Sequence, residues 1–162
     1  MKKVIATLVV GSALGLTACS DFFADPVAVH NGLVDQMDAV LAAEQGFYEE
    51  YFSIEDGQPL ADLVKFNDEF AEEAANLDEY FTDTKFADSQ QSFVDGYNEY
   101  YKATLDAYVA DAEVFVTALE AKGENFDLAT AEGYFAKMDE HATKFVENHN
   151  KLIDVVNLQA DY

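Results

Sequence analysis

The chain has 162 residues, a length that suits one domain, and its 50% hydrophobic and 14% aromatic content is too apolar for a disordered chain. It carries 32 Asp and Glu against nine Lys and Arg, a net charge of −23 at neutral pH. This acidic balance argues against a nucleic-acid partner, whose phosphates need Lys and Arg, and against electrostatic docking onto anionic lipid. We therefore expect a folded, strongly acidic domain.

The first residues have the layout of an export signal. Lys2 and Lys3 give a positive start, and residues 4–16 form an apolar run rich in small side chains. A membrane-spanning helix takes about 20 apolar residues, so this run has the length of a signal segment instead. The prediction is that the segment directs export and is removed.

The apolar run ends in Leu16-Thr17-Ala18-Cys19. These four residues resemble the lipobox of bacterial lipoprotein precursors, which reads Leu-small-small-Cys. The resemblance implies that residues 1–18 are a cleaved signal peptide, that diacylglycerol is attached to the thiol of Cys19, and that a further acyl chain such as palmitate often joins the new amino group. Two or three acyl chains hold a protein stably on a membrane.

An ordinary secretory signal is the alternative, with Cys19 the only cysteine of the chain by chance. A general signal peptidase needs small residues at positions −3 and −1, and Leu16 at −3 does not fit. We expect residues 19–26 to be a lipidated tether and the protein to be exported to the cell envelope. Ser20 after the cysteine resembles the outer-membrane sorting pattern of Gram-negative hosts; in a Gram-positive host the location would be the outer face of the cytoplasmic membrane.

From residue 27 onward, apolar residues recur at steps of three and four, as in amphipathic helices. Breaks at residues 55–59, 82–84 and 122–125 divide this region into four helices. The expected inward positions of the first helix are Leu33, Met37, Val40, Glu44, Phe47 and Tyr51, and those of the second are Leu60, Leu63, Asn67, Phe70, Ala74, Leu77 and Phe81. In the third helix they are Phe86, Phe93, Tyr97, Tyr100, Tyr101, Thr104, Tyr108, Ala112, Phe115 and Leu119. In the fourth helix they are Leu128, Ala131, Phe135, Met138, Ala142, Phe145, His149, Leu152 and Val156. Short connections make neighbouring helices antiparallel, so residues 27–162 are predicted to form an all-α, up-down-up-down four-helix bundle.

Each predicted stripe contains a polar residue, and folding the helices back at the three turns places these residues at one level. They are Glu44, Asn67, Tyr100 and His149. Buried polar groups are costly unless they are hydrogen-bonded, and a Glu and a His in contact would favour the ionised pair. The sequence therefore predicts a polar layer near the middle of the bundle.

Two interpretations of this layer stay open. It could bind a metal, haem or a small polar ligand, or it could be a hydrogen-bonded layer that fixes the register of the helices. A catalytic zinc site wants three good ligands and the layer offers two, while the Glu-x-x-His repeat of di-iron bundles and the Cys-x-x-Cys-His motif of covalent haem are missing from the sequence. We expect no metal, no cofactor and no catalytic residue.

The sequence HNGLVDQ at residues 30–36 resembles the start of all-helical envelope lipoproteins of the YiiG-like type, whose function is uncharacterised. This resemblance implies a fold and a location, and it carries no catalytic residues. The function that we expect is therefore non-enzymatic: an acidic helical lipoprotein with a structural or interaction role, whose partner is an envelope protein or the cell wall. A ligand-binding lipoprotein that uses the polar layer is the alternative.

Overall fold

The computed structural model describes residues 25–55, 59–122 and 128–158. The predicted signal peptide and Cys19 lie outside these residues. The first two helices are α1 (Pro26–Ser53) and α2 (Ala61–Asp83), and the last is α5 (Leu128–Leu158). Between them the chain forms a 3₁₀ turn η1 (Asp88–Gln90), α3 (Gln91–Gly96), a π-helical turn η2 (Tyr97–Tyr101) and α4 (Lys102–Glu120), which together make one long, interrupted rod.

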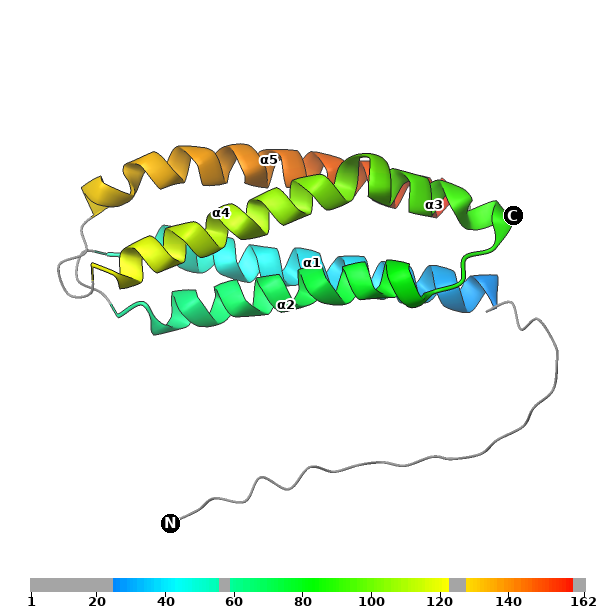
Figure 1. Cartoon of the computed structure of the whole chain (residues 1–162), viewed down its shortest axis with the longest axis horizontal. Coiled ribbons are helices and arrows are strands. Elements are labelled where there is room, and N and C mark those ends of the chain that lie inside the picture. Colours follow the sequence, from blue (N-terminus) through cyan, green and yellow to red (C-terminus); the bar gives the residue numbers. More distant parts are fainter. Residues whose placement is uncertain (1–24, 56–58, 123–127, 159–162) are drawn as a thin grey trace, which may run out of the picture.

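These four rods lie side by side, and each runs in the opposite direction to the one before it (Figure 1). Helix α1 packs against α2, α2 against α4, α4 against α5, and α5 closes the ring against α1. The part of the chain that the structure describes contains no strand. The predicted all-α helical bundle is confirmed. None of the described helices is both long enough and apolar enough to cross a membrane.

The helix boundaries follow local sequence signals at most ends. The Asp25 side chain caps α1 by accepting a hydrogen bond from the Val27 amide at 3.0 Å, and Pro26 occupies the first turn, where its missing amide proton costs nothing. Helix α2 ends at Asp83, inside the predicted break, because Thr84 is extended. It begins at Ala61, so Pro59 precedes the first turn and does not occupy it.

The predicted inward positions of α1 and α5 match the core well. All the α1 positions are buried, and so are the α5 positions from Met138 to Val156. The side chains of the three earlier α5 positions, Leu128, Ala131 and Phe135, lie outside those described. In α2, Leu63, Asn67, Phe70 and Leu77 are buried, while Leu60, Ala74 and Phe81 are half-buried against them. A period of 3.6 residues therefore describes the straight helices correctly.

The third rod departs from the predicted stripe. Tyr101 is buried as expected, and so is Leu105, which was not among the expected positions. Tyr100 and Thr104, which were expected inside, are only half-buried. The buried hydrophobic side chains of this stretch are Phe93, Tyr97, Tyr101 and Leu105, each four residues after the one before. In an α-helix three such steps turn the side chain by about 120° away from its starting face. The π-helical turn η2 is wider and absorbs this extra rotation, so the core face stays aligned.

Candidate functional site: the polar core layer

Three of the four residues predicted for the polar layer are buried. Their exposed fractions are 4% for Glu44, 7% for Asn67 and 3% for His149. Tyr100 is half-buried and faces another side of its helix, with the Lys151 ammonium 3.6 Å from the centre of its ring. The structure therefore does not place Tyr100 with the other three, and neighbouring tyrosines of the same rod take its place.

Glu44 is bonded to Tyr108. The Tyr108 hydroxyl donates a hydrogen bond to Glu44 Oε1 at 2.9 Å, and the Tyr108 side chain is fully buried. Burial raises the pKa of Glu44 above its ordinary value, and the hydrogen bond from Tyr108 offsets part of that rise. The pKa of Tyr108 is also raised, so the phenol keeps its proton and remains the donor. The pair holds a carboxyl group in an apolar core with a single neutral partner.

His149 forms the second pair, with Tyr101. The Tyr101 hydroxyl and His149 Nδ1 lie 3.1 Å apart and share a hydrogen bond. Burial lowers the pKa of His149, and the charge of Asp38 opposes this only in part. The imidazole is therefore neutral under ordinary conditions. Glu44 and His149 each bond to a tyrosine and not to each other. The ion pair expected if the two were in contact is therefore not formed.

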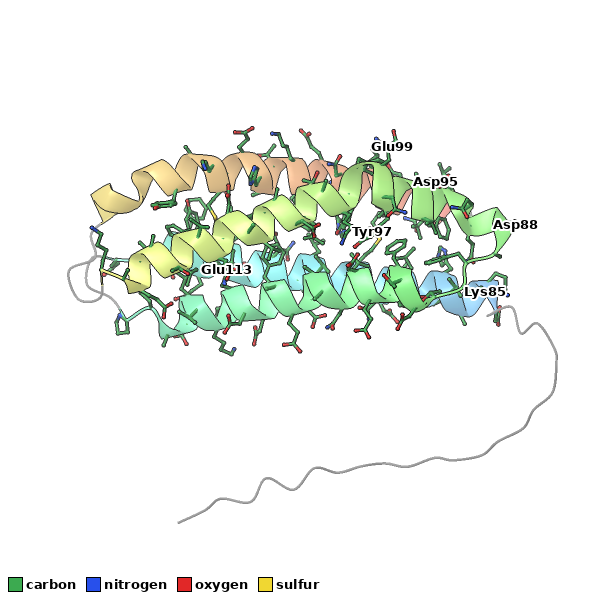
Figure 2. All side chains as sticks on the ribbon, in the orientation of Figure 1. Lys85, Asp88, Asp95, Tyr97, Glu99 and Glu113 are labelled. Atoms are coloured by element: carbon green, nitrogen blue, oxygen red, sulfur yellow. The ribbon has the colours of Figure 1, made fainter. Side chains whose placement is uncertain are left out.

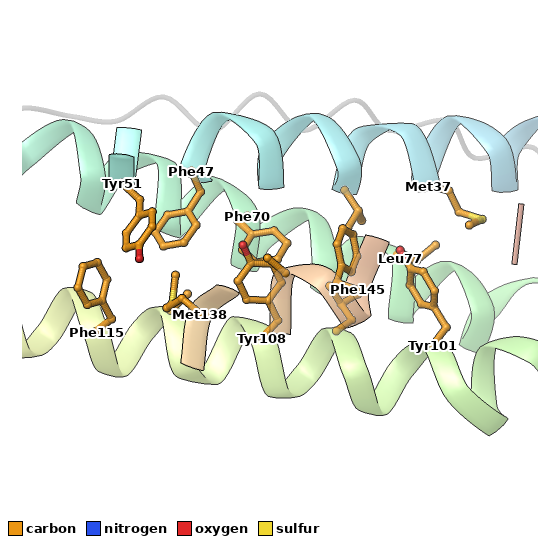
Figure 3. Packing of buried hydrophobic residues seen from close by; sticks show 14 of the residues in the cluster. Met37, Phe47, Tyr51, Phe70, Leu77, Tyr101, Tyr108, Phe115, Met138 and Phe145 are labelled. Carbon is orange, nitrogen blue, oxygen red and sulfur yellow. The ribbon is translucent and has the colours of Figure 1, made fainter. Parts of the chain in front are cut away.

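Aromatic rings fill the space around the two pairs. Phe145 packs against Tyr101 and Tyr108 at 5.9 Å between ring centres and against His149 at 5.6 Å. Figure 3 shows Tyr101, Phe145 and Tyr108 between the helices, and Phe70, Phe47 and Tyr51 continue the row. Such packing leaves the carboxyl and imidazole groups in contact with rings and hydroxyls, as expected for a layer that fixes helix register.

Side chains from α4 and α5 hold the π-helical turn. The carbonyl oxygen of Tyr100 accepts hydrogen bonds from Thr104 Oγ1 at 2.8 Å and from Asn148 Nδ2 at 3.2 Å, and Asn148 Nδ2 also lies 2.8 Å from Thr104 Oγ1. Wide turns expose carbonyl groups that a neighbouring helix can satisfy. Asn148 precedes His149 on α5, so the helix that supplies the buried imidazole also holds the turn that presents Tyr101 to it.

A second polar cluster lies at the surface between α2 and α4. Tyr97, which Figure 2 labels, donates a hydrogen bond to Asp78 Oδ1 at 3.0 Å, and Lys102 Nζ lies 2.5 Å from the same oxygen. The Lys102 ammonium holds the pKa of Asp78 below its usual range. A groove of about 320 Å³ runs past this cluster and is lined by alanines and charged side chains of α2 and α4. Lys102 pairs with Asp78 and, at 3.7 Å, with Asp106, so these three charges are explained without a ligand.

The structure gives the layer no metal-binding geometry. Within residues 25–55, 59–122 and 128–158, no three His, Cys, Asp or Glu side chains lie close enough together to hold a metal ion. The partners that sequence reasoning did not select, Tyr101 and Tyr108, both belong to the predicted stripe of the third rod. Their pairing with His149 and Glu44 depends on the turn at η2, for which the sequence carries no evident signal.

Comparison with known proteins places this fold in no family. No protein-family model matches the chain, and no curated protein and no solved structure shows significant similarity to it. The class of protein that the fold defines is an acidic four-helix bundle with a tyrosine-bonded polar layer in its core. Any assignment of function has to come from the residues themselves.

Proposed function

We propose that this protein is an exported lipoprotein of the bacterial cell envelope, in which lipid on Cys19 holds an acidic helical bundle at a membrane. The observation that carries the proposal is the sequence Leu16-Thr17-Ala18-Cys19 at the end of an apolar run, with the only cysteine of the chain at the position that lipidation requires. In a Gram-negative host, Ser20 favours the outer membrane over retention at the cytoplasmic membrane.

The role of the bundle in this proposal is non-enzymatic. Glu44 and His149 are bonded to tyrosine hydroxyls, and in the groove between α2 and α4 Lys102 is paired with Asp78 and Asp106. These arrangements favour a rigid spacer or binding module whose acidic surface meets an envelope protein or the cell wall. The same surface argues against nucleic acid, because few cations are available to contact phosphate groups.

Lipidation is tested by expressing the full chain and the Cys19→Ser variant in a bacterial host. We expect the parent chain to lose residues 1–18, to gain the mass of a diacylglyceryl group and to enter the detergent phase on phase separation. The variant should lack the added mass and keep residues 1–18, because the motif offers no site to an ordinary signal peptidase. Thr17→Ala, which keeps a small residue in the motif, is the matched control and should behave as the parent.

A parent chain that is cleaved without gaining acyl mass would support the ordinary secretory signal and overturn the proposal. The interaction role has its own test: the lipidated chain is cross-linked in intact cells, extracted in detergent and analysed for attached protein or cell-wall fragments. We expect a defined cross-linked species. Recovery of the chain without any such species would argue against a partner in the envelope.

A further inference from the structure

We propose that the bundle stands end-on at the membrane, with the end at which α1 begins and α5 finishes resting against the lipid surface. This inference rests on the lipid attachment proposed above, and it adds which part of the protein meets the membrane. The occupant of this surface is the interface of a bilayer with electrically neutral headgroups, because the acidic chain disfavours anionic lipid.

The predicted anchor enters the bundle at this end. Cys19 precedes Pro26 by seven residues, which span at most about 25 Å when fully extended. Helix α1 has 28 residues and is therefore about 42 Å long, so its last turn lies well beyond that reach when the bundle stands upright. The end that holds the start of α1 and the finish of α5 (Figure 1) is the one that the lipid keeps near the bilayer.

The start of α1 is fixed to the rest of this end by hydrogen bonds. Gln90 Nε2 donates to the carbonyl oxygen of Pro26 at 2.9 Å, and the Tyr80 hydroxyl donates to the carbonyl oxygen of Val29 at 2.7 Å. Tyr80 lies in the last turn of α2 and Gln90 in η1, the turn that leads into α3. The first turn of α1, where the anchor enters, is therefore fixed to the other helices at this end, so that the bundle moves with it as one body.

Exposed apolar side chains at this end fit a lipid interface. Val27 is 65% exposed and Leu158 is 71% exposed, and they lie in the first turn of α1 and the last turn of α5. Phe52, which is 62% exposed, lies at the opposite end of the bundle. A single exposed apolar residue is common on proteins. What distinguishes Val27 and Leu158 is that the proposed anchor brings their end to the bilayer.

The long sides of the bundle oppose a flat orientation. Exposed carboxylates run along them, among which are Asp68 and Glu72 on α2 and Glu140 and Glu147 on α5. Laying such a side on the bilayer would move these charges toward a medium of low dielectric constant, which is costly. At the proposed contact end, Figure 2 shows Lys85 and Asp88, and the carboxylate of Asp25 is already bonded to the α1 amide of Val27. Asp25, Asp83, Lys85 and Asp88 are exposed at this end, fewer than the exposed charged residues along α2 or α5, so fewer of the described charges are desolvated when the bundle stands on it.

The chain contains no tryptophan, so single-tryptophan variants report on one place each. The full chain carrying Val27→Trp, Leu158→Trp or, as the control of similar exposure at the far end, Phe52→Trp is produced in a bacterial host, and lipidation is verified by intact mass. Each variant is reconstituted into phosphatidylcholine vesicles with brominated or ordinary acyl chains. We expect brominated lipid to cause a loss of fluorescence at positions 27 and 158 and none at position 52.

A second variant tests the contact itself. Val27→Asp combined with Leu158→Trp places a charge in the proposed lipid interface at an exposed position, where folding is not at risk, and should abolish the quenching at position 158. Lipidated protein that shows no quenching at either position, or equal quenching at all three, overturns the end-on orientation alone. Protein whose mass shows no acyl group overturns the proposed function and this inference together.

Discussion

The Tyr108 hydroxyl donates a hydrogen bond to Glu44 Oε1 at 2.9 Å across the core, which joins α4 to α1 at a place from which water is excluded. A carboxyl group in such a place favours its protonated form, because the ionised form loses hydration that one phenol cannot replace. The stability of the bundle should therefore depend on the protonation of this one residue.

Glu44→Gln keeps the size of the side chain and an acceptor for Tyr108 but removes the titration. The folded state binds the Glu44 proton more tightly than the unfolded state, whose pKa is near 4.5. The stabilisation is therefore fully present below that pH and is lost as the pH rises through the raised folded pKa. In urea unfolding, the variant should gain stability over the parent as the pH rises toward neutrality. A constant difference across this range would contradict a protonated Glu44.

His149→Gln should have the opposite dependence on pH. The pKa of His149 is lowered by burial, so between the ordinary value of 6.5 and the lower folded value the unfolded state binds a proton that the folded state does not. The parent should therefore lose stability as the pH falls below about 6.5. The variant should lose less over the same interval. Urea unfolding at a series of pH values measures both slopes, and equal slopes would show that folding does not lower the pKa of His149.

The tyrosines of the third rod should respond differently to loss of their hydroxyl groups. Tyr108→Phe leaves Glu44 without its hydrogen bond and should cost about 1–3 kcal/mol in the free energy of unfolding. The Tyr100 hydroxyl is buried but has no hydrogen-bond partner among the described residues, so Tyr100→Phe should be neutral or stabilising. Comparable losses for the two variants would place Tyr100 in the polar layer after all.

Two glycines in helices provide a matched pair. A Cβ atom at Gly96 would lie 2.8 Å from the Tyr100 hydroxyl and 3.0 Å from Leu152 Cδ1, whereas one at Gly133 would meet nothing within 4 Å. Gly96→Ala should therefore cost about 1–3 kcal/mol through overpacking. Gly133→Ala should stabilise by about 0.5–1 kcal/mol through helix propensity. Thermal and urea unfolding of both variants decide the matter, and stabilisation by Gly96→Ala would show that the rods separate easily there.

Screening of the acidic surface should raise the melting temperature between low and moderate salt. The net charge is −23, and on α2 Asp68 precedes Glu72 by four residues, which places like charges side by side. Glu72→Gln should stabilise the bundle by about 0.2–0.5 kcal/mol at low salt and by less at high salt. A melting temperature that stays flat or falls as salt is added would show that repulsion between these carboxylates is not a significant cost.

Much of this fold could be predicted from residue order. The inward positions of α1, from Leu33 to Tyr51, and the burial of Glu44, Asn67 and His149 follow from an α-helix whose side chains return to one face every 3.6 residues. The export segment and the lipobox are likewise predictions from the sequence alone, because enzymes that process a precursor read a local motif, and they remain predictions. The prediction of the inward positions needs only the assumption that each apolar stripe packs against other helices. The prediction of the N-terminal motif needs no knowledge of the fold.

Tertiary structure decided which hydroxyl groups complete the polar layer. A straight α-helix from residue 86 onward makes Tyr100 and Thr104 as good candidates as Tyr101 and Leu105. The π-helical turn at η2, held by Asn148 of α5 and Thr104, rotates the rod so that Tyr101 meets His149. Such a turn is stabilised by contacts between residues more than forty positions apart, about which local sequence patterns carry no information.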